Sequence, residues 1–254
     1  SRQRQWLIEN WIAEGTLHLL DGHEKAGKST LIHSMIPALV TGTPWFGKIK
    51  TKPCHVLYLD FENPPDYIRD NLLYNMPRED WEAVASKLSI PAEMPFCVSR
   101  EWLLRYMERN KLLGQAGVVF IDSAIAAFNG LFSGQNRLWE NNQSDVRAAL
   151  KHTEDVARQT GWAVVIVHHQ NKTGGTGGSM QWGGGVDLML SYNEKDGGRV
   201  LSAKGGRWSG KRPISLIFAK PEERLVLMGD ACQVFHQEED GKLELSSPIA
   251  KFLS

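Results

Sequence analysis

Apolar residues gather in four short, uninterrupted runs along the first two-thirds of the chain. These runs lack the polar alternation of a half-exposed strand, so they predict strands buried on both faces, as in a parallel sheet. They are TLHLLD (16–21), HVLYLD (55–60), GVVFID (117–122) and WAVVIVH (162–168). Helix-like stretches separate them, and this alternation predicts an α/β fold with a mostly parallel central sheet flanked by helices.

The remaining stretches of this part of the chain predict helices. An amphipathic pattern predicts a short N-terminal helix in RQWLIENWIAEG (4–15), ending at Gly15. Five further helices are predicted at about 31–40, 64–75, 79–87, 100–112 and 141–161, the last with a glycine stop.

The last third of the chain has a different pattern, in which short β runs alternate with turn residues. The runs are VDLMLSY (186–192), GRVLSAKG (198–205), RPISLIFA (212–219) and ERLVLMGD (223–230). They predict antiparallel strands at the end of the sheet. No repeat or boundary is evident, so residues 1–254 are predicted to form a single domain with a core of about 15–229. The final stretch (236–254) predicts a hairpin and a terminal helix, or the start of another domain.

Composition narrows the classes of protein that fit this pattern. Lys+Arg and Asp+Glu number 29 each, so the formal net charge is zero. A protein that wraps DNA by bulk charge would be basic, although a local basic groove or a lined pore stays possible. The three cysteines form no CxxC pair, and no apolar run approaches the ~18 residues of a membrane span. With no signal-peptide pattern, we expect a reduced, cytoplasmic protein, and the start at Ser1 rather than Met fits either a trimmed chain or a fragment of a longer one.

Residues 22–30, GHEKAGKST, match the phosphate-binding pattern GxxxxGK[ST] between a predicted strand and a predicted helix. Glycines let backbone N–H groups turn toward phosphate oxygens, and the helix N-terminus adds partial positive charge. Lys28 would reach the β- and γ-phosphates of ATP, and Ser29 would hold Mg²⁺. The expected nucleotide-binding residues are Gly22, His23, Glu24, Lys25, Ala26, Gly27, Lys28, Ser29 and Thr30.

Two carboxylates follow neighbouring predicted strands. Asp122 closes the third apolar run, the pattern of an Asp that holds Mg²⁺ through water. No Glu follows it directly, so the base that polarises the attacking water must come from elsewhere. Glu62 lies just past the carboxyl end of the second run, where open parallel sheets bind ligands, and we expect it to be this base.

The fourth run ends in two adjacent histidines, His168 and His169. They could be metal ligands, a catalytic base pair or part of a phosphate sensor. Adjacent strand residues point to opposite faces, so the pair cannot easily chelate one ion. We expect His169 to hydrogen-bond the γ-phosphate or the attacking water, and His168 to face the protein interior.

Together these residues resemble the RecA-like ATPases, and within them the RepA-like branch of ring-forming replicative helicases. The resemblance covers about residues 15–229 and includes the stretch NNQSDVRAAL (141–150). Its motif residues are Gly22 to Thr30, Glu62, Asp122, Ser123, His168, His169, Lys172 and Gly174 to Ser179. It implies Mg²⁺-dependent ATP hydrolysis between the subunits of a ring, with a hexamer expected, coupled to DNA.

The resemblance also implies a finger, a cation that a neighbouring subunit supplies to the active site. LSAKGGRWSG (201–210) offers Lys204 and Arg207 on a hairpin-like turn. Such a finger contributes about 10³–10⁵ to the rate of phosphoryl transfer. The alternative is a solvated turn that carries two cations.

In this family, the loops after the third and fourth strands face the central pore. Here they pair Arg137 with Trp139 and Lys172 with Trp182, and these two tryptophans are, with Trp208, the candidates for exposure. Cations and stacking aromatics bind single-stranded DNA, at about 1–3 kcal/mol per stacked base. The alternative is that the tryptophans pack beneath the loops.

Three function classes therefore remain open. They are a hexameric DNA helicase, a recombination or repair ATPase without unwinding activity, and a regulatory ATPase of the KaiC kind that binds no nucleic acid.

Overall fold

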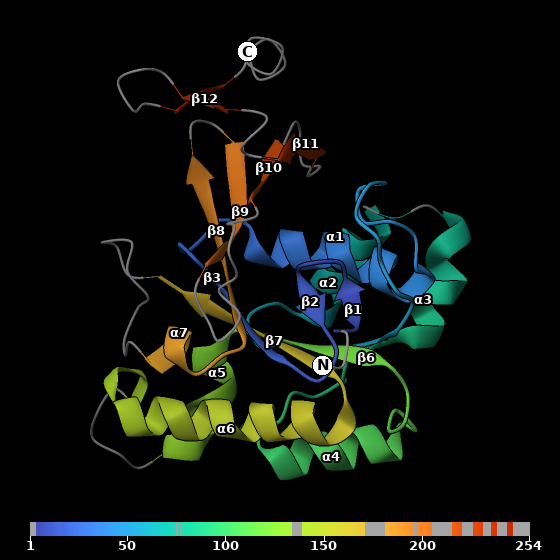
Figure 1. Ribbon diagram of the computed structural model, residues 1–254. Coiled ribbons are helices and arrows are strands. Elements are labelled where there is room, and N and C mark those ends of the chain that lie inside the picture. The colour runs from blue at the N-terminus through green and yellow to red at the C-terminus, as the bar shows by residue number, and fades with distance from the viewer. Residues whose placement is uncertain are drawn as a thin grey trace.

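The structure is a computed structural model built around a nine-stranded sheet (Figure 1). It describes residues 4–74, 76, 78–133, 139–170, 181–195, 198–204, 215–219, 226–230, 235–237 and 243–245. The strand order is β11-β10-β9-β8-β3-β7-β6-β4-β5. Strands from β8 to β5 are mutually parallel, whereas β9, β10 and β11 continue the sheet antiparallel. This arrangement confirms the predicted α/β class and its antiparallel C-terminal strands.

The strands follow the apolar runs closely. The sheet is made of β3 (Leu17–Gly22), β4 (His55–Asp60), β5 (Leu88–Ser89), β6 (Gly117–Asp122), β7 (Ala163–His169), β8 (Leu188–Lys195), β9 (Gly198–Lys204), β10 (Ser215–Ala219) and β11 (Val226–Asp230). Outside this sheet, β12 (Phe235–Gln237) pairs antiparallel with β13 (Leu243–Leu245), which confirms the predicted C-terminal hairpin. The terminal helix expected after it lies outside the described residues.

Helices cover both faces of the sheet and bury one hydrophobic core on each side (Figure 1). One face carries α1 (Lys28–Thr41), α2 (Pro65–Tyr74) and α3 (Trp81–Lys87). The other carries α4 (Arg100–Arg109), α5 (Ala124–Phe128) and α6 (Gln143–Thr160). Shorter helical turns are η1 (Arg78–Asp80), η2 (Asn129–Phe132), η3 (Trp139–Asn141) and α7 (Gln181–Gly184). None of the described helices is long and apolar enough to cross a membrane.

The ends of α6 show why the long helix was predictable. The Asn142 side chain caps its first turn by accepting hydrogen bonds from the Ser144 and Asp145 amides. Gly161 ends it in the left-handed region, with φ of 79°. These are the usual N-cap and C-cap solutions for unpaired helix-end groups.

The predicted N-terminal helix is wrong. Residues 6–13 form a short antiparallel hairpin of β1 (Trp6–Ile8) and β2 (Ile12–Ala13). Asn10 turns the chain with φ of 67°, a conformation that Asn tolerates better than most residues. Leu7, Ile8, Trp11, Ile12 and Ala13 are all buried, and the exposed Asn10 lies at the turn between the two strands.

Candidate active site

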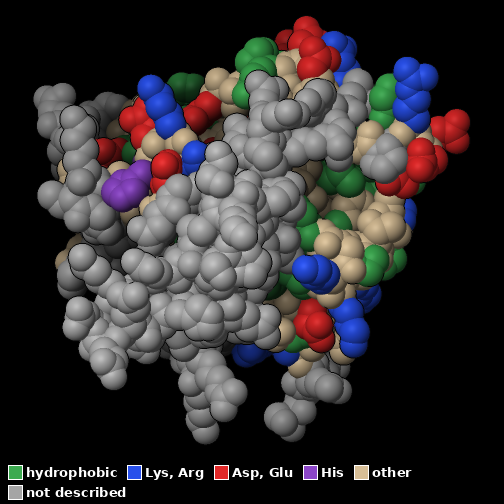
Figure 2. Space-filling model, turned by 90° about the horizontal axis from the view of Figure 1, so that it is seen from above, with side chains coloured by type: hydrophobic (Ala, Val, Ile, Leu, Met, Phe, Trp, Pro, Cys, Tyr) green, Lys and Arg blue, Asp and Glu red, His purple; other side chains and the backbone are tan. Residues whose placement is uncertain are grey.

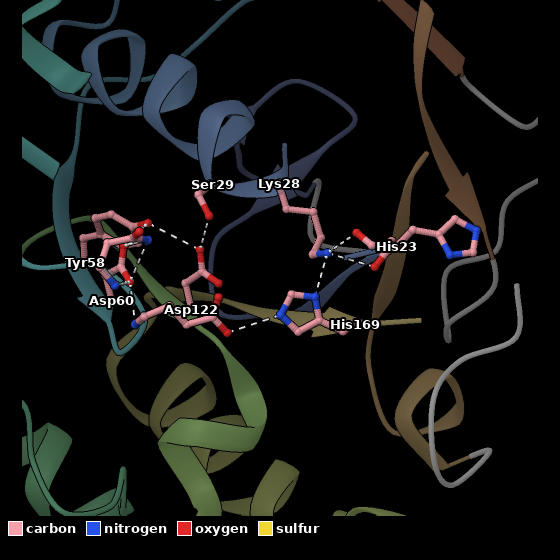
Figure 3. A network of polar contacts seen from close by, with 10 residues as sticks. His23, Lys28, Ser29, Tyr58, Asp60, Asp122 and His169 are labelled. Carbon is pink, nitrogen blue, oxygen red and sulfur yellow. Dashed lines mark hydrogen bonds and ion pairs between the residues drawn. The ribbon is translucent and has the colours of Figure 1, made fainter. Parts of the chain in front are cut away.

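Of the predicted site residues, Lys28, Ser29, Asp122 and His169 meet at the carboxyl edge of the sheet (Figure 3). Register pairs Gly22 at the end of β3 with His169 at the end of β7, and Asp60 of β4 with Asp122 of β6. Because these four strands are parallel and adjacent, their ends deliver loops to one place. This edge is where open α/β sheets bind their ligands.

The loop between β3 and α1 has the backbone shape that phosphate binding requires. Lys25 and Gly27 both adopt positive φ, at 63° and 88°, and the Ala26 amide donates to the His23 carbonyl. Gly27 precedes α1 without a side-chain cap, so the first amides of the helix stay available to an anion. The loop therefore fits the phosphates of a nucleotide.

Lys28 is folded back over this loop. Its ammonium donates to the carbonyl oxygens of Gly22 and His23, both at 2.8 Å. The residue is 4% exposed, and burial lowers the pKa of its ammonium. A cation held by weak neutral acceptors is free to exchange them for phosphate oxygens.

Ser29 and Asp122 lie together, as predicted for a magnesium site. The Ser29 hydroxyl donates to Asp122 Oδ2 at 2.7 Å. Burial raises the pKa of Asp122 to about 6, and the nearby carboxylates of Asp60 and Glu62 act in the same direction. Hydroxyl and carboxylate oxygens are ligands that Mg²⁺ accepts, so the pair fits this ion. Among the residues that the structure describes, no group of three His, Cys, Asp or Glu could hold a metal, so water and phosphate would complete the shell.

His169 links Lys28 (Figure 3) to Glu62 in a continuous hydrogen-bonded chain. Lys28 Nζ lies 3.0 Å from His169 Nδ1, and His169 Nε2 lies 3.2 Å from Glu62 Oε1. Since an ammonium can only donate, Nδ1 accepts and Nε2 carries the proton that Glu62 accepts. This hydrogen bond lowers the pKa of Glu62 to about 2, so the carboxylate is ionised. The predicted base thus lies beside the phosphate-binding lysine.

His168 points to the opposite side of the sheet from His169, as expected for adjacent residues on a strand. It is 1% exposed, and its Nδ1 lies 3.3 Å from Asp21 Oδ1. Gln170 donates to the other Asp21 oxygen at 2.7 Å. The His168 ring also packs on Trp182, with 4.5 Å between ring centroids. The structure therefore places His169 in the site and His168 in the interior.

Asp60 is a site residue that the sequence analysis missed. It is 2% exposed, and its Oδ1 accepts hydrogen bonds from the amides of Glu62 and Asn63, both at 2.9 Å. Its Oδ2 accepts from the Tyr58 hydroxyl at 3.0 Å (Figure 3). Asp60 thereby fixes the turn that presents Glu62. An Asp that closes an apolar strand, as Asp122 does, was the available signal.

Trp139 and Trp182, two of the three candidates for exposure, are buried, in agreement with the alternative that they pack beneath the loops, and Trp208 lies outside the described residues. Trp182 is fully buried and Trp139 is 3% exposed. Their rings lie 5.9 Å apart, and Trp139 also stacks on Phe132. Trp182 therefore has no free face for a DNA base in this conformation, because His168 and Trp139 occupy its surroundings.

The other predicted DNA-contacting residues and fingers are not placed. Arg137, Lys172 and Arg207 lie outside the described residues, as does the Gly174 to Ser179 tract. Lys204 ends β9, and only its backbone is described.

Comparison with known proteins agrees with this geometry. A family model described as an AAA domain matches residues 1–175. A solved KaiC-like protein from the hyperthermophilic archaeon Pyrococcus horikoshii OT3 is similar in structure, with a TM-score of 0.59 at 15% identity. The match covers 87% of this chain and 93% of that chain, and shows the shared RecA-like fold. No curated protein matches the sequence. The chain belongs to the AAA domain family and is a RecA-like P-loop ATPase.

Proposed function

We propose that the protein hydrolyses ATP with Mg²⁺ at the subunit interfaces of a ring and couples this reaction to single-stranded DNA, as RepA-like replicative helicases do. The hydrogen-bonded chain from Lys28 through His169 to Glu62 carries the hydrolytic part of the proposal. It joins a phosphate-binding cation to an ionised carboxylate through one histidine.

Each residue of the site has a separate role in the proposed hydrolysis. Lys28 leaves the carbonyls of Gly22 and His23 for the phosphates, and the amides at the start of α1 bind the same oxygens. Glu62, held by Asp60, orients the attacking water and accepts its proton, a role worth about 10²–10⁴ in rate. Ser29 and Asp122 would hold Mg²⁺, which when bound neutralises charge on the phosphate oxygens.

His169 is suited to report which state the nucleotide is in. When Lys28 turns toward phosphate, Nδ1 of His169 loses its donor and can take a new partner. Gln170 follows directly on the chain, and residues 171–180, which we propose face the pore, come next. Loss of the γ-phosphate would thus change the hydrogen-bond partners of His169, immediately before this segment.

Surface charge gives limited support for DNA binding. On the face in Figure 2, described acidic and basic side chains lie interspersed rather than sorted by sign. DNA binding would therefore depend on local groups such as Arg137 and Lys172, with Lys204 or Arg207 serving the neighbouring site.

The rate of ATP hydrolysis with and without single-stranded DNA tests the proposal, with Lys28→Ala as the inactive control. We expect turnover that needs Mg²⁺, is lost in the variant and rises with DNA. Mass measurement with ATP should detect a ring, and strand displacement should separate a helicase from a recombination ATPase. A ring whose turnover ignores DNA would contradict the coupling and favour a KaiC-like regulatory ATPase, and normal hydrolysis by Lys28→Ala would contradict the site.

A further inference from the structure

Strands β8 and β9 lie against the phosphate-binding loop from the antiparallel side of the sheet. The His23 amide donates to the Asn193 side chain of β8 at 3.2 Å. Gly22 packs on the Tyr192 carbonyl of the same strand. From β9, Arg199 Nη1 donates to the carbonyl oxygen of Ala26 at 2.6 Å. Both ends of the loop are thus held by residues about 170 positions away in sequence.

The contact to Ala26 is the dominant interaction of Arg199. Glu194, directly opposite on β8, also approaches Arg199 Nη1, but at 3.7 Å. The Glu194 side chain is 69% exposed and that of Arg199 is 20% exposed. Exposed ion pairs of this kind contribute little, whereas a short hydrogen bond from a charged donor is among the stronger ones. Arg199 is therefore anchored to the loop rather than to its neighbour on the sheet.

Holding the Ala26 carbonyl also fixes the amide that follows it. In a planar trans peptide, the carbonyl oxygen of Ala26 and the N–H of Gly27 point in opposite directions. The guanidinium of Arg199 lies beside this peptide, with Nε 3.9 Å from where a Gly27 side chain would begin. The Gly27 N–H accordingly points away from β9. A cradle for phosphate is made of such amides turned toward the ligand.

We propose that Arg199 is a positioning residue of the nucleotide site, which keeps the peptide between Ala26 and Gly27 in the orientation that binds phosphate. The inference rests on the nucleotide binding proposed above. Without Arg199, this peptide is free to rotate, because Gly27 has no side chain to restrict it. The loop then samples orientations that turn a carbonyl oxygen, rather than an amide, toward the phosphates.

Variants at Arg199 separate the loss of its hydrogen bond from the loss of its charge. Arg199→Met keeps the approximate length of the side chain and removes every donor, whereas Arg199→Lys keeps the charge and one donor nitrogen. Arg105→Met is the matched control, since Arg105 is exposed on α4 at the opposite face of the sheet. The readouts are the Kd for ADP and for ATP with Mg²⁺, KM and kcat for hydrolysis, and thermal unfolding without nucleotide.

We expect Arg199→Met to raise the Kd and KM about tenfold, the worth of one hydrogen bond to a charged donor. Its kcat should change less than about twofold, because Glu62 and Asp60 are untouched. Arg199→Lys should recover part of the affinity, and Arg105→Met should match the wild type.

Two results would overturn the inference. The first is a wild-type Kd in Arg199→Met, even with lowered thermal stability, because Arg199 would then only brace the fold. The second is a fall in kcat without a change in Kd. If the wild type itself binds neither ADP nor ATP, the proposed function fails as well, so the two failures are distinguishable.

Discussion

Gly22→Ala should destabilise the protein in the absence of any nucleotide. A methyl group at position 22 would lie 2.1 Å from the Tyr192 carbonyl oxygen and 3.2 Å from its carbon. Both atoms belong to the backbone of β8, which pairs with β3, so no flexible side chain can yield. Restoring an ordinary 3.4 Å contact requires the two strands to separate by about 1.3 Å. The first glycine of the loop is thus required by the sheet as well as by the phosphates.

Overpacking of this kind costs about 1–3 kcal/mol, and in a chain of this size each kcal/mol lowers Tm by about 2–4 °C. We therefore expect a Tm about 2–12 °C below the wild type, measured by circular dichroism without nucleotide. Gly184→Ala in α7 is the control, since nothing lies within 4 Å of its added methyl. Wild-type stability in Gly22→Ala, with weakened ATP binding alone, would refute the reasoning, because the glycine would then serve only the phosphates.

Three further predictions concern the base, the finger and the core. Glu62→Gln should bind ATP normally but turn it over about 10²–10⁴ times more slowly in single-turnover assays, and unchanged turnover would place the base elsewhere. Lys28→Ala subunits mixed with Arg207→Ala subunits should regain part of the ATPase activity, and co-assembled rings that stay inactive would contradict the finger. Burial lowers the pKa of His18 from 6.5 to about 4. Between these two pH values the unfolded chain therefore binds a proton that the folded chain does not. The free energy of unfolding should rise from pH 4 to pH 6.5, and His18→Gln should reduce this rise in urea titrations without abolishing it, because burial also lowers the pKa of His33 to about 4; an unchanged slope would contradict the assignment.

The central strands were the most predictable part of the fold. The predicted runs 55–60 and 117–122 coincide with β4 and β6, because strands buried on both faces have an unbroken apolar pattern. The N-terminal hairpin was not predictable in the same way. Its apolar residues from Leu7 to Ala13 are buried, but in eight positions an apolar cluster fits either a turn of helix or two short strands.

The candidate site was predictable where local motifs define it. The loop at 22–30, Glu62 and Asp122 could be placed together because parallel strand ends share one edge of the sheet. Contacts between distant segments could not be predicted. Arg199 contacts Ala26 across 173 residues, and this contact depends on a strand register that cannot be derived from the sequence. The burial of Trp182 was missed for a related reason. Its glycine-rich neighbours in the sequence suggested exposure, whereas in the structure its ring packs on His168.

Strand β9 connects an observed contact to a predicted one. Arg199 near its start contacts the subunit's own nucleotide loop, and Lys204 at its end is the predicted finger for the next subunit. Lys204 lies five positions after Arg199 along the extended strand, a span of roughly 17 Å with little capacity to stretch. In a ring of such subunits, movement of one nucleotide loop would shift β9 as a rigid unit. Lys204 would then move at the neighbouring subunit's site. The order in which subunits hydrolyse ATP would then depend on the stiffness of one β-strand as well as on nucleotide affinity.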